Sequence, residues 1–408
     1  MKNNGGILTA AADFGSSGVR VAVAEVLDAG AIRLLGIGES ESQGISEGRV
    51  VDMEKAVSSL QNAIKEAEIV SRRRFSSAWA AITGEHIIGV NAGGSTVISD
   101  PAGVSTTDIH KVKQMARAEV AHRSGMRVIA VLERDYELDG HKGVKKPVGM
   151  SGHKLSGDMH LVLASTNALA DWEKCLLQCG VETEEQFVFA PLAAARAVLS
   201  EDEKNLGVCV LDIGASVTDA AIFYRGVVAD TFSLPMASND IHRDIAEMHH
   251  ASMESAEQAK RTIGLSGDNG EFVSLLEAGG GGEHTQSILV VRDTIGHRVD
   301  EILELAGERL ARLSDAGKRL SAGIVLVGDG ALLPGIAGAA ETKLNIPARI
   351  GRPTYRGENH ERAASPRFAV CMGLLQAAAE YDSAVSQGGG IGAAVGWVSR
   401  LFGGRGTE

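Results

Sequence analysis

The segment VCVLDIGASVTDAAI, residues 208–222, reads as two apolar strands joined by an Asp-x-Gly-x-Ser turn at Asp212, Gly214 and Ser216. The same pattern occurs about half a chain earlier, in TAAADFGSSGVRVAV at residues 9–23. Glycine permits a tight turn whose backbone N–H groups can approach a phosphate, and an aspartate at a strand end can hold Mg²⁺. A repeat on this scale predicts two similar halves, whose turns face each other across a cleft and bind one nucleotide triphosphate from both sides.

Composition indicates a globular protein with two or more domains or subdomains. The chain has 408 residues, of which 44% are hydrophobic and 23% charged, and its aromatic content of 4% predicts a core built from Val, Ile, Leu and Ala. The formal net charge of −12 argues against nucleic acid as a partner, because binding it requires a basic face. Neither a transmembrane helix nor a signal peptide is expected, since no uncharged apolar run could span a bilayer and the N-terminus enters a strand pattern directly.

Apolar periodicity divides the chain into strand-rich and helical stretches. Residues 7–37 predict three strands, and a helix over 50–69 is expected to begin after a cap at Asp52. Residues 85–163 contain more turns and polar residues, which is typical of an inserted subdomain. Further helices are expected at 107–122, 168–180, 190–200, 240–250, 255–264, 288–313 and 369–381.

A third glycine-rich segment, GIVLVGDGALLPGI at residues 323–336, predicts a buried strand, a tight turn and a helix. One Asp-x-Gly-x-Ser turn alone would be weak evidence, since many hairpins contain one. Two with matched flanks, followed by this third turn, resemble the phosphate 1, phosphate 2 and adenosine motifs of the actin, sugar-kinase and Hsp70 superfamily. The alternative is that all three are ordinary tight turns.

Within that superfamily, several segments resemble FtsA, the bacterial actin-like cell-division family. They are PVGMSGHKL at 147–155 with DMHL at 158–161, ITGEHI at 82–87, GRVVD at 48–52, AEQAK at 256–260 and RIGRP at 349–353. The resemblance covers nearly the whole chain. It implies an α/β, actin-like ATPase fold: two ribonuclease-H-like lobes around a nucleotide cleft, with an inserted small α+β subdomain of the 1C type and a C-terminal amphipathic helix.

The resemblance also implies a division of the chain. Lobe 1, or 1A, would take residues 5–85 and 164–200, and the inserted subdomain 1C would take 86–163. Lobe 2, or 2A, would take 201–235 and 321–381, and subdomain 2B would take 236–320. A linker at 382–390 would lead to a membrane-targeting amphipathic helix at 391–402.

The nucleotide contacts of the family can be placed by position. ATP or ADP would contact phosphate loop 1 at Asp13, Gly15, Ser16 and Ser17, and phosphate loop 2 at Asp212, Gly214, Ala215 and Ser216. Glu257 and Lys260, one helical turn apart, would lie near the ribose, and Gly328, Asp329 and Gly330 near the adenine and the α-phosphate. Asp13 and Asp212 would hold Mg²⁺ through water.

Several positions depart from the family pattern. Gly18 follows Ser17 where the family has lysine, and Asp329 interrupts the Gly-Gly of the adenosine loop, where a carboxylate would repel phosphates unless it points outward. Superfamily members that hydrolyse ATP briskly have Glu or Gln near the start of the helix before loop 2, where this chain has Ala190. We therefore expect weak nucleotide binding, at most very slow ATP hydrolysis and no assignable catalytic residue.

The C-terminal segment carries one apolar helical stripe. Its members are Ile391, Ala394, Val395, Val398, Leu401 and Phe402, with Trp397 at the edge. The segment is too short to span a bilayer but could lie in its interface. Its position after a glycine linker favours a free membrane anchor over a helix docked on the protein's own core. FtsA proteins typically end in such a helix, which implies a peripheral location on the cytoplasmic face of the bacterial inner membrane, at the division site.

The resemblance implies specific partners. FtsA proteins receive the C-terminal peptide of the tubulin-like protein FtsZ on the region matching residues 236–320, where Arg298 would meet an acidic group of the peptide. A solvated helix arginine is the alternative for Arg298, and His249 and His250 are expected to be exposed. Self-assembly in actin-like fashion and contacts with other division proteins are also implied.

The sequence therefore predicts a cell-division adaptor that binds ATP, self-assembles and tethers FtsZ filaments to the membrane. A PilM-like assembly adaptor and a sugar-kinase-like ATP-dependent enzyme are the alternatives. The PVGMSG segment and the terminal apolar stripe favour the FtsA family over PilM. A kinase would need a catalytic aspartate and a substrate pocket beside loop 1, for which the sequence offers no candidate.

Overall fold

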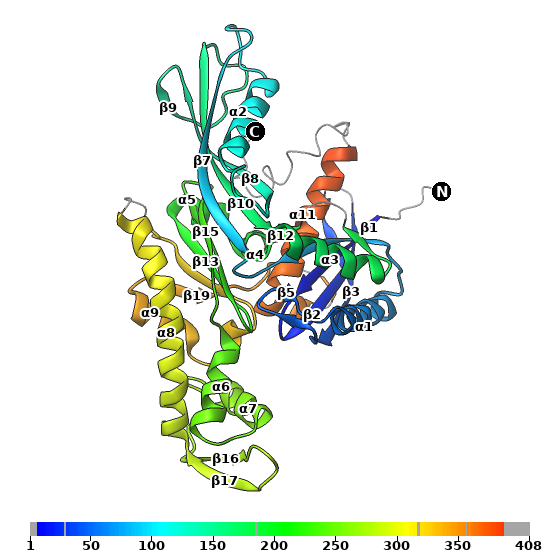
Figure 1. Ribbon diagram of the computed structural model, residues 1–408, viewed down its shortest axis with the longest axis vertical. Coiled ribbons are helices and arrows are strands. Elements are labelled where there is room, and N and C mark those ends of the chain that lie inside the picture. The colour runs from blue at the N-terminus through cyan, green and yellow to red at the C-terminus, as the bar shows by residue number, and fades with distance from the viewer. Residues whose placement is uncertain are drawn as a thin grey trace.

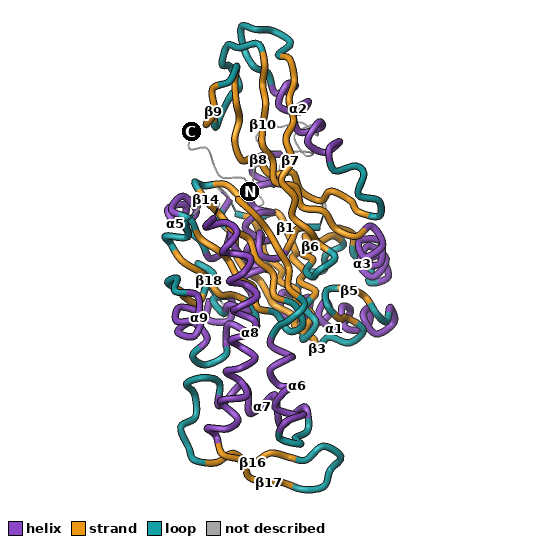
Figure 2. The backbone as a smooth tube through the Cα atoms, turned by 60° about the vertical axis from the view of Figure 1, so that its left-hand side comes forward, coloured by secondary structure: helices purple, strands orange, loops and turns teal. Residues whose placement is uncertain are grey.

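The computed structural model describes residues 6–27, 30–183, 187–315, 319–355, 357–358 and 360–386. Figure 1 shows two sheet-based lobes side by side at the middle of an elongated molecule. A strand-rich insertion rises at one end and a helical arm extends at the other, and Figure 2 shows the same arrangement from a second direction.

Lobe 1 consists of a six-stranded sheet and the helices that cover it. The sheet has the order β11-β6-β1-β2-β3, with β12 also paired to β6. Its strands are β1 (Ile7–Phe14), β2 (Gly18–Val26), β3 (Ile32–Glu41), β6 (Ser77–Ile82), β11 (Glu182–Thr183) and β12 (Val188–Phe189). Its helices are α1 (Met53–Ser71), α3 (Thr166–Gln178), α4 (Ala190–Val198) and α11 (Ala369–Ser386), and a short hairpin joins β4 (Ile45–Ser46) to β5 (Arg49–Val50).

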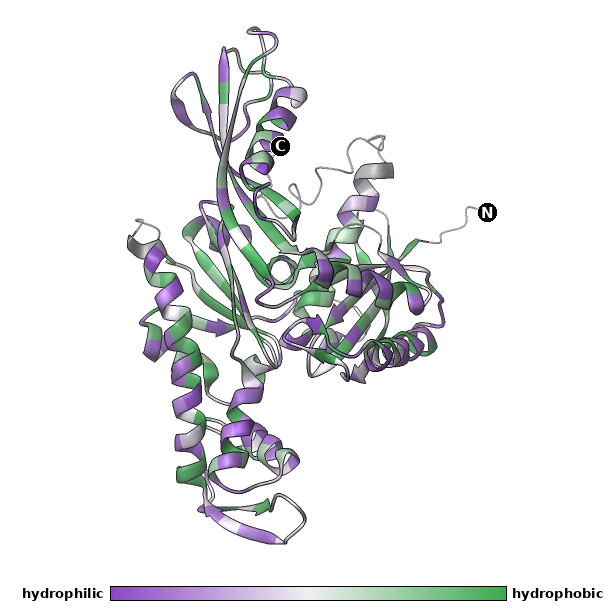
Figure 3. Cartoon of the chain, viewed as in Figure 1, coloured by the Kyte–Doolittle hydropathy of each residue, from purple (hydrophilic) through white to green (hydrophobic). Residues whose placement is uncertain are grey.

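Small aliphatic residues let these layers approach closely. Strand β2, GVRVAVAEV, is buried along its whole length, and the predicted core of Val, Ile, Leu and Ala is confirmed. Figure 3 shows hydrophobic residues concentrated in the sheets. The rings of Phe14 on β1 and Trp172 on α3 stack with their centroids 4.3 Å apart. Helix α1 begins at the predicted cap, because the Asp52 side chain accepts a hydrogen bond from the Lys55 N–H at 3.2 Å.

Lobe 2 repeats the hairpin arrangement in a five-stranded sheet of order β15-β14-β13-β18-β19. In both lobes an antiparallel hairpin is formed by the first two strands, and the first strand has a parallel partner, β6 or β18. The strands are β13 (Val208–Ile213), β14 (Thr218–Tyr224), β15 (Val227–Leu234), β18 (Gly323–Val327) and β19 (Ala348–Ile350). The same part of the chain contains α5 (Glu201–Leu206), α9 (Ile336–Leu344), α10 (His360–Ala363) and the 3-10 turns η2 (Gly330–Leu332) and η3 (Pro366–Phe368).

The insertion is a four-stranded antiparallel sheet of order β7-β10-β8-β9 with one helix. Its elements are β7 (Ile87–Val97), α2 (Thr106–Glu119), β8 (Met126–Leu138), β9 (His141–Val144) and β10 (Lys154–Ser165). Helix α2 begins with a capping box formed by Ser105 and Asp108. The insertion leaves lobe 1 after β6 and returns to it at α3, yet β7 and β8 also pack against β15 of lobe 2.

The arm consists of α6 (Ser238–Met248), α7 (Met253–Ile263), the hairpin of β16 (Phe272–Leu276) and β17 (Glu283–Ser287), and α8 (Ile288–Asp315). Helix α8 buries Val291, Ile295 and Val299 at helical spacing. The expectation that His249 is exposed is wrong, because its Nε2 lies 3.0 Å from Thr294 Oγ1 on α8 and the side chain is buried there.

Candidate functional site

Two hairpins of the same register carry the predicted phosphate loops. In lobe 1 Asp13 pairs with Arg20 across the β1–β2 hairpin, and in lobe 2 Asp212 pairs with Asp219 across the β13–β14 hairpin. Each aspartate lies at the carboxyl end of a strand that has a parallel neighbour, the edge at which α/β sheets bind their ligands. The two turns thus share a backbone arrangement but differ in the charge opposite the aspartate.

The third glycine turn packs directly on the second hairpin. Gly328 has a φ of +84°, and a Cβ there would collide with Asp212 Oδ1 and with the carbonyl oxygen of Ile213. A Cβ on Gly330 would collide with the Ile213 side chain. Glycine is therefore required at both positions, and the predicted adenosine loop lies against loop 2.

Asp329, between those glycines, points toward lobe 1. Its Oδ2 accepts hydrogen bonds from Ser17 Oγ at 2.7 Å and from Arg20 Nη2 at 2.5 Å. Its Oδ1 accepts a hydrogen bond from Arg367 Nε at 2.9 Å. The outward orientation that would spare a phosphate does not occur, since the carboxylate is directed at phosphate loop 1.

Arg20 is the centre of this charged network. The residue is 4% exposed, and its guanidinium also pairs with Glu39 at 3.2 Å and with Asp13 at 3.5 Å. Arg367 pairs with Glu39 as well, at 3.0 Å. A buried guanidinium requires such partners, because its desolvation is costly. The network therefore connects loop 1, the adenosine loop and the η3 turn.

The aspartates of the cleft differ in pKa. Burial raises the pKa of Asp13, an effect partly offset by the neighbouring arginine. Burial, together with the charges of Asp13 and Asp219, raises the pKa of Asp212 well above its ordinary value. Burial also raises the pKa of Asp219 to about 6. Burial by itself would raise the pKa of Asp329 too, but the two arginines that pair with it lower that pKa to about 2.

Lys260 is buried beside loop 2. Its Nζ donates to the carbonyl oxygen of Ser238 at 3.1 Å and lies 3.1 Å from His242 Nδ1. Burial lowers the pKa of Lys260 to about 8 and that of His242 to about 4. Ser238 begins α6, and its N–H donates to the carbonyl oxygen of Gly214 at 3.2 Å. Lys260 thus supports the helix end on which loop 2 rests.

The other predicted contacts are distributed around these groups. The carbonyl oxygen of Ala215 accepts a hydrogen bond from the Asn239 N–H at 2.7 Å, so α6 holds loop 2 at a second point. Ser16 and Ser216 are half-buried in their turns. Glu257 pairs with Arg261 on the surface of α7 at 2.6 Å and does not bond to Lys260.

The cleft fits the phosphates of a nucleotide except at one residue. The glycine turns leave room for a phosphate to approach the backbone of both lobes, and Asp13 and Asp212 could supply carboxylates toward Mg²⁺. The exception is Asp329, since its carboxylate occupies the donors of Ser17 and Arg20. Among the residues that the structure describes, no three His, Cys, Asp or Glu side chains gather around one metal position. A Mg²⁺ ion held by Asp13 and Asp212 would take its other ligands from water or phosphate oxygens.

Sequence reasoning missed three residues of the cleft. Arg20 could have been found, because the register of the hairpin places it opposite Asp13. Asp219 follows in the same way from its position opposite Asp212. Arg367 has no local signal, since it reaches the cleft only through the tertiary placement of the η3 turn.

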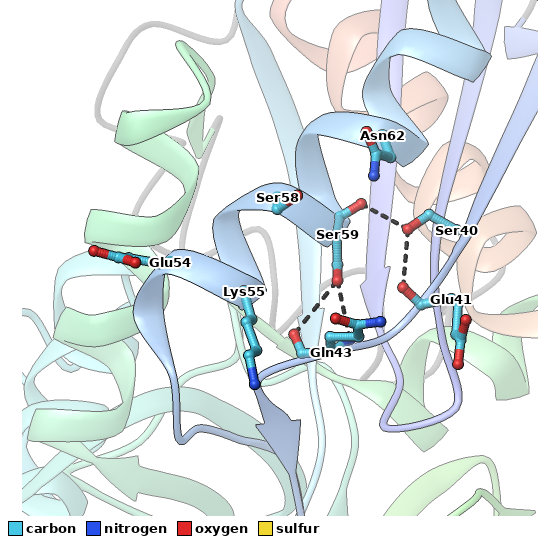
Figure 4. Close-up of a pocket in the computed structure, with 8 residues that line it drawn as sticks. All are labelled: Ser40, Glu41, Gln43, Glu54, Lys55, Ser58, Ser59 and Asn62. Atoms are coloured by element: carbon cyan, nitrogen blue, oxygen red, sulfur yellow. Dashed lines mark hydrogen bonds between the residues drawn. The ribbon is translucent and has the colours of Figure 1, made fainter.

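A polar pocket lies near loop 1, at the end of β3 and the start of α1 (Figure 4). Its lining residues are Ser40, Glu41, Gln43, Glu54, Lys55, Ser58, Ser59 and Asn62. Ser40 Oγ donates to the carbonyl oxygen of Ser59, and Ser59 Oγ accepts from the Gln43 N–H, both at 2.9 Å. In Figure 4 the carboxylates of Glu41 and Glu54 point away from these hydroxyls.

Arg298, the predicted partner contact, is paired within the arm. Its Nε and Nη2 donate to the two carboxylate oxygens of Asp244 at 2.7 and 2.8 Å, and its Nη1 donates to Glu301 at 2.8 Å. The bidentate pair joins α6 to α8. The side chain of Glu301 is 53% exposed and that of Asp244 only 21%, so an acidic peptide group would reach the guanidinium by replacing Glu301.

The predicted membrane stripe lies outside the described residues, which end with α11 at Ser386. This applies to Ile391, Ala394, Val395, Trp397, Val398, Leu401 and Phe402. In the described part of the chain, no helix combines the length and the apolar character needed to cross a membrane.

Two lobes with the same hairpin arrangement, whose glycine turns face each other, define an actin-like fold. Solved structures share this fold. A chain of the PilM-PilN type IV pilus biogenesis complex matches with a TM-score of 0.64 at 16% identity, over 90% of this chain and 97% of the solved chain. MreB5 of Spiroplasma citri bound to ADP matches with a TM-score of 0.50 at 15% identity, over 94% of this chain and 99% of the solved chain. At these identities the likeness concerns the fold alone.

The chain belongs to the FtsA cell division protein family. The family profiles "Cell division protein FtsA" and "SHS2 domain inserted in FTSA" match residues 209–373 and 84–163. Cell division protein FtsA of Neisseria meningitidis serogroup B is 31% identical over 92% of this chain and 91% of its own length. The protein of the same name from Pseudomonas aeruginosa is 34% identical over 89% of this chain and 87% of its own length. The insertion is thus the SHS2 domain of this family, and the family resemblance is confirmed.

Proposed function

We propose that the chain is a cell-division adaptor that binds ATP or ADP with Mg²⁺ between its lobes, self-assembles in actin-like fashion, and tethers FtsZ filaments to the cytoplasmic face of the inner membrane at the division site. Family membership supports the role in cell division. The observation that supports nucleotide binding is the proximity of Asp13 and Asp212, each at the end of a strand that leads into a glycine turn. The domain bounds expected from the sequence are part of this proposal, except that α11 (Ala369–Ser386), which was expected in lobe 2 and the linker, packs on the sheet of lobe 1.

Nucleotide would act as a structural ligand more than as a substrate. Its phosphates would bridge the turns of both lobes and so favour the closed arrangement. Ala190, at the start of α4, is buried and apolar, so it cannot orient a water molecule for attack on the γ-phosphate. Calorimetric titration with ATP·Mg²⁺ tests the site: saturable binding with phosphate release near background is expected, and the absence of binding at millimolar ATP would contradict it.

The arm offers an apolar surface for the FtsZ C-terminal peptide. Leu289 and Val290 at the start of α8 are exposed, as are Phe272 and Leu276 on β16. The backbone bond from the Ile288 N–H to the carbonyl oxygen of residue 271 holds the hairpin beside α8. Exposed apolar side chains on neighbouring elements are typical of a protein-binding surface.

Fluorescence anisotropy with a labelled FtsZ C-terminal peptide tests this surface. Leu289→Ser should weaken peptide binding about tenfold, the loss typical of a truncated interface anchor. Ile69→Ser is the matched control, since Ile69 on lobe 1 is 76% exposed and Leu289 is 70% exposed. Equal affinities of the native chain and Leu289→Ser would place the peptide elsewhere.

Attachment to lipid would depend on the apolar stripe at residues 391–402. Flotation with vesicles of phosphatidylglycerol and phosphatidylethanolamine compares the full chain with a chain that ends at Ser386 and so retains α11 entire. We expect the shortened chain, and the full chain with Trp397→Glu, to lose vesicle binding because an apolar face is needed for interfacial burial. Equal flotation of the full and shortened chains would exclude the stripe as the anchor.

A further inference from the structure

The donors around Asp329 form a complete anion site. Ser17 Oγ and Arg20 Nη2 donate to one carboxylate oxygen at 2.7 and 2.5 Å, and Arg367 Nε donates to the other at 2.9 Å. Arg20 is buried, and its remaining contacts are with two further carboxylates. An anion at this position therefore satisfies a hydroxyl and two guanidinium groups at once.

The anion that fills this site, the Asp329 carboxylate, belongs to the lobe opposite Ser17 and Arg20. Ser17 and Arg20 belong to the β1–β2 hairpin of lobe 1, whereas Asp329 follows β18 of lobe 2, 312 and 309 residues away in sequence. The glycine neighbours of Asp329 pack on loop 2 with no room for a side chain, so the carboxylate is carried by a turn fixed to lobe 2. The hydrogen bonds from Ser17 and Arg20 therefore connect the lobes at their facing turns, and Arg367 adds a bond to Asp329 from the η3 turn.

We propose that this anion site, formed by Ser17, Arg20 and Arg367, receives the phosphates of a nucleoside polyphosphate. The Asp329 carboxylate fills the site as an internal competitor, and we call this arrangement the Asp329 latch. The lobes are held together by the protein's own anion in the absence of nucleotide, and a nucleotide must displace the latch before it can bridge the two phosphate loops. This inference rests on the proposed nucleotide cleft and adds how access to it is regulated.

Charge and burial favour such a competition. Two anions cannot use the same donors, and a phosphate beside an ionised carboxylate is repelled. Asp329 remains ionised at neutral pH, since its arginine partners lower its pKa to about 2 although burial opposes them. When the Asp329 carboxylate leaves, the buried Arg20 loses an anionic partner. A polyphosphate can take the place of that carboxylate, whereas a nucleoside without phosphates cannot.

Calorimetric affinities of the full chain for ATP·Mg²⁺ and for magnesium tripolyphosphate test the proposal. Asp329→Asn removes the charge and keeps the shape, so both ligands should bind about 10- to 100-fold more tightly than to the native chain, the range expected for charge-assisted hydrogen bonds. Glu203→Gln is the matched control. It breaks an ion pair of 2.7 Å with Arg349, between α5 and β19, and should leave both affinities unchanged.

Hydrogen exchange without ligand gives a second measurement that does not depend on nucleotide. Asp329→Asn and, separately, Arg367→Gln should raise the exchange rates of backbone amides in the turns at residues 14–18 and 328–332, because each variant removes contacts of the latch. Glu203→Gln should not change these rates. If one latch variant fails to fold, the other still tests the prediction.

The possible results have different meanings. Tighter binding by Asp329→Asn with faster exchange supports the latch. Equal and measurable affinities of the native chain and Asp329→Asn, or unchanged exchange in both latch variants, overturn the latch and leave the nucleotide cleft intact. Tighter binding of tripolyphosphate without any binding of ATP supports the anion site and overturns the proposed nucleotide. No binding of either ligand to either protein overturns both.

Discussion

His160 Nε2 lies 2.9 Å from Thr231 Oγ1, a contact that joins the insertion to lobe 2. The imidazole is fully buried, and its Nδ1 lies 2.7 Å from Asn91 Oδ1. A neutral ring that donates through Nδ1 to the amide oxygen accepts the threonine hydroxyl through Nε2. Because the insertion emerges from lobe 1, this contact makes the insertion a bridge between the lobes.

Thr231→Val should loosen that bridge. The variant keeps the shape of the side chain but leaves a buried imidazole nitrogen without its donor, so we expect the free energy of unfolding to fall by about 1–3 kcal/mol. Urea unfolding followed by circular dichroism measures the change. Thr342→Val removes an exposed hydroxyl on α9 and should alter stability by less than about 0.5 kcal/mol. Similar effects of the two substitutions would contradict the bridge.

Asp219 should make stability depend on pH. Its carboxylate accepts hydrogen bonds from Thr83 Oγ1 and the Gly84 N–H, and burial raises its pKa to about 6. Since the folded state binds this proton more strongly than the unfolded state, the stabilising contribution is complete below the ordinary aspartate pKa and is lost as pH rises toward 6. Asp219→Asn should remove roughly 3 kcal/mol of that fall, at about 1.36 kcal/mol per pKa unit.

Unfolding titrations at intervals between about pH 4 and pH 7, near the ordinary and the raised pKa, measure this difference. Asp171→Asn on α3, whose 3.6 Å partner Lys174 stays charged over this range, is the control and should leave the pH profile unchanged. The assignment to Asp219 fails if Asp219→Asn and the native chain lose stability in parallel as the pH rises.

Helices α4 and α11 cross at Gly373. A Cβ at Gly373 would collide with the carbonyl oxygen of Ala193. Because a backbone obstacle cannot rotate away, Gly373→Ala should destabilise the protein by about 2 kcal/mol. Gly338 on α9 has open space around it, so Gly338→Ala should stabilise by about 0.5–1 kcal/mol through helix propensity. Differential scanning calorimetry should give opposite shifts in Tm, and shifts of the same sign would be evidence against the close crossing.

Glu301 should compete with the FtsZ peptide if Arg298 binds an acidic group of that peptide. Glu301→Gln leaves the ion pair between Arg298 and Asp244 in place and weakens the hydrogen bond that Arg298 Nη1 donates to residue 301. We expect peptide affinity to rise about 1.5- to 5-fold, as for an exposed ion pair. Glu304→Gln on the same helix, which loses a pair with Lys343 of 3.3 Å, is the control for the change in net charge. Equal affinities of the two variants would leave Arg298 a structural residue.

The repeat and most of the helices could be predicted because their signals are local. The turn at Asp212 and its apolar flanks specify a hairpin without help from distant parts of the chain. In the same way, the Asp52 cap fixes the start of α1 at Met53. Boundaries were less accurate. Helix α11 continues to Ser386, beyond the expected end at residue 381, because no glycine or proline interrupts it earlier.

The charged network of the cleft could not be predicted, because it depends on contacts between distant segments. The carboxylate of Asp329 has partners in the β1–β2 hairpin and in the η3 turn, and no local pattern relates these parts of the chain. The burial of His249 has the same origin, since Thr294 meets it from another helix. The nucleotide contacts and the membrane stripe stay predictions.

The unlike residues opposite the two aspartates, Arg20 in lobe 1 and Asp219 in lobe 2, break the symmetry of the duplication. An exact duplication would place the same charged residues in both lobes. A ligand between the lobes could then bind in two equivalent orientations. Here the residue at the paired position is a guanidinium in lobe 1 and a carboxyl group with a raised pKa in lobe 2. An elongated ligand with one anionic end would therefore meet unlike groups in its two possible orientations, and this difference would favour one orientation before the sugar or base is recognised.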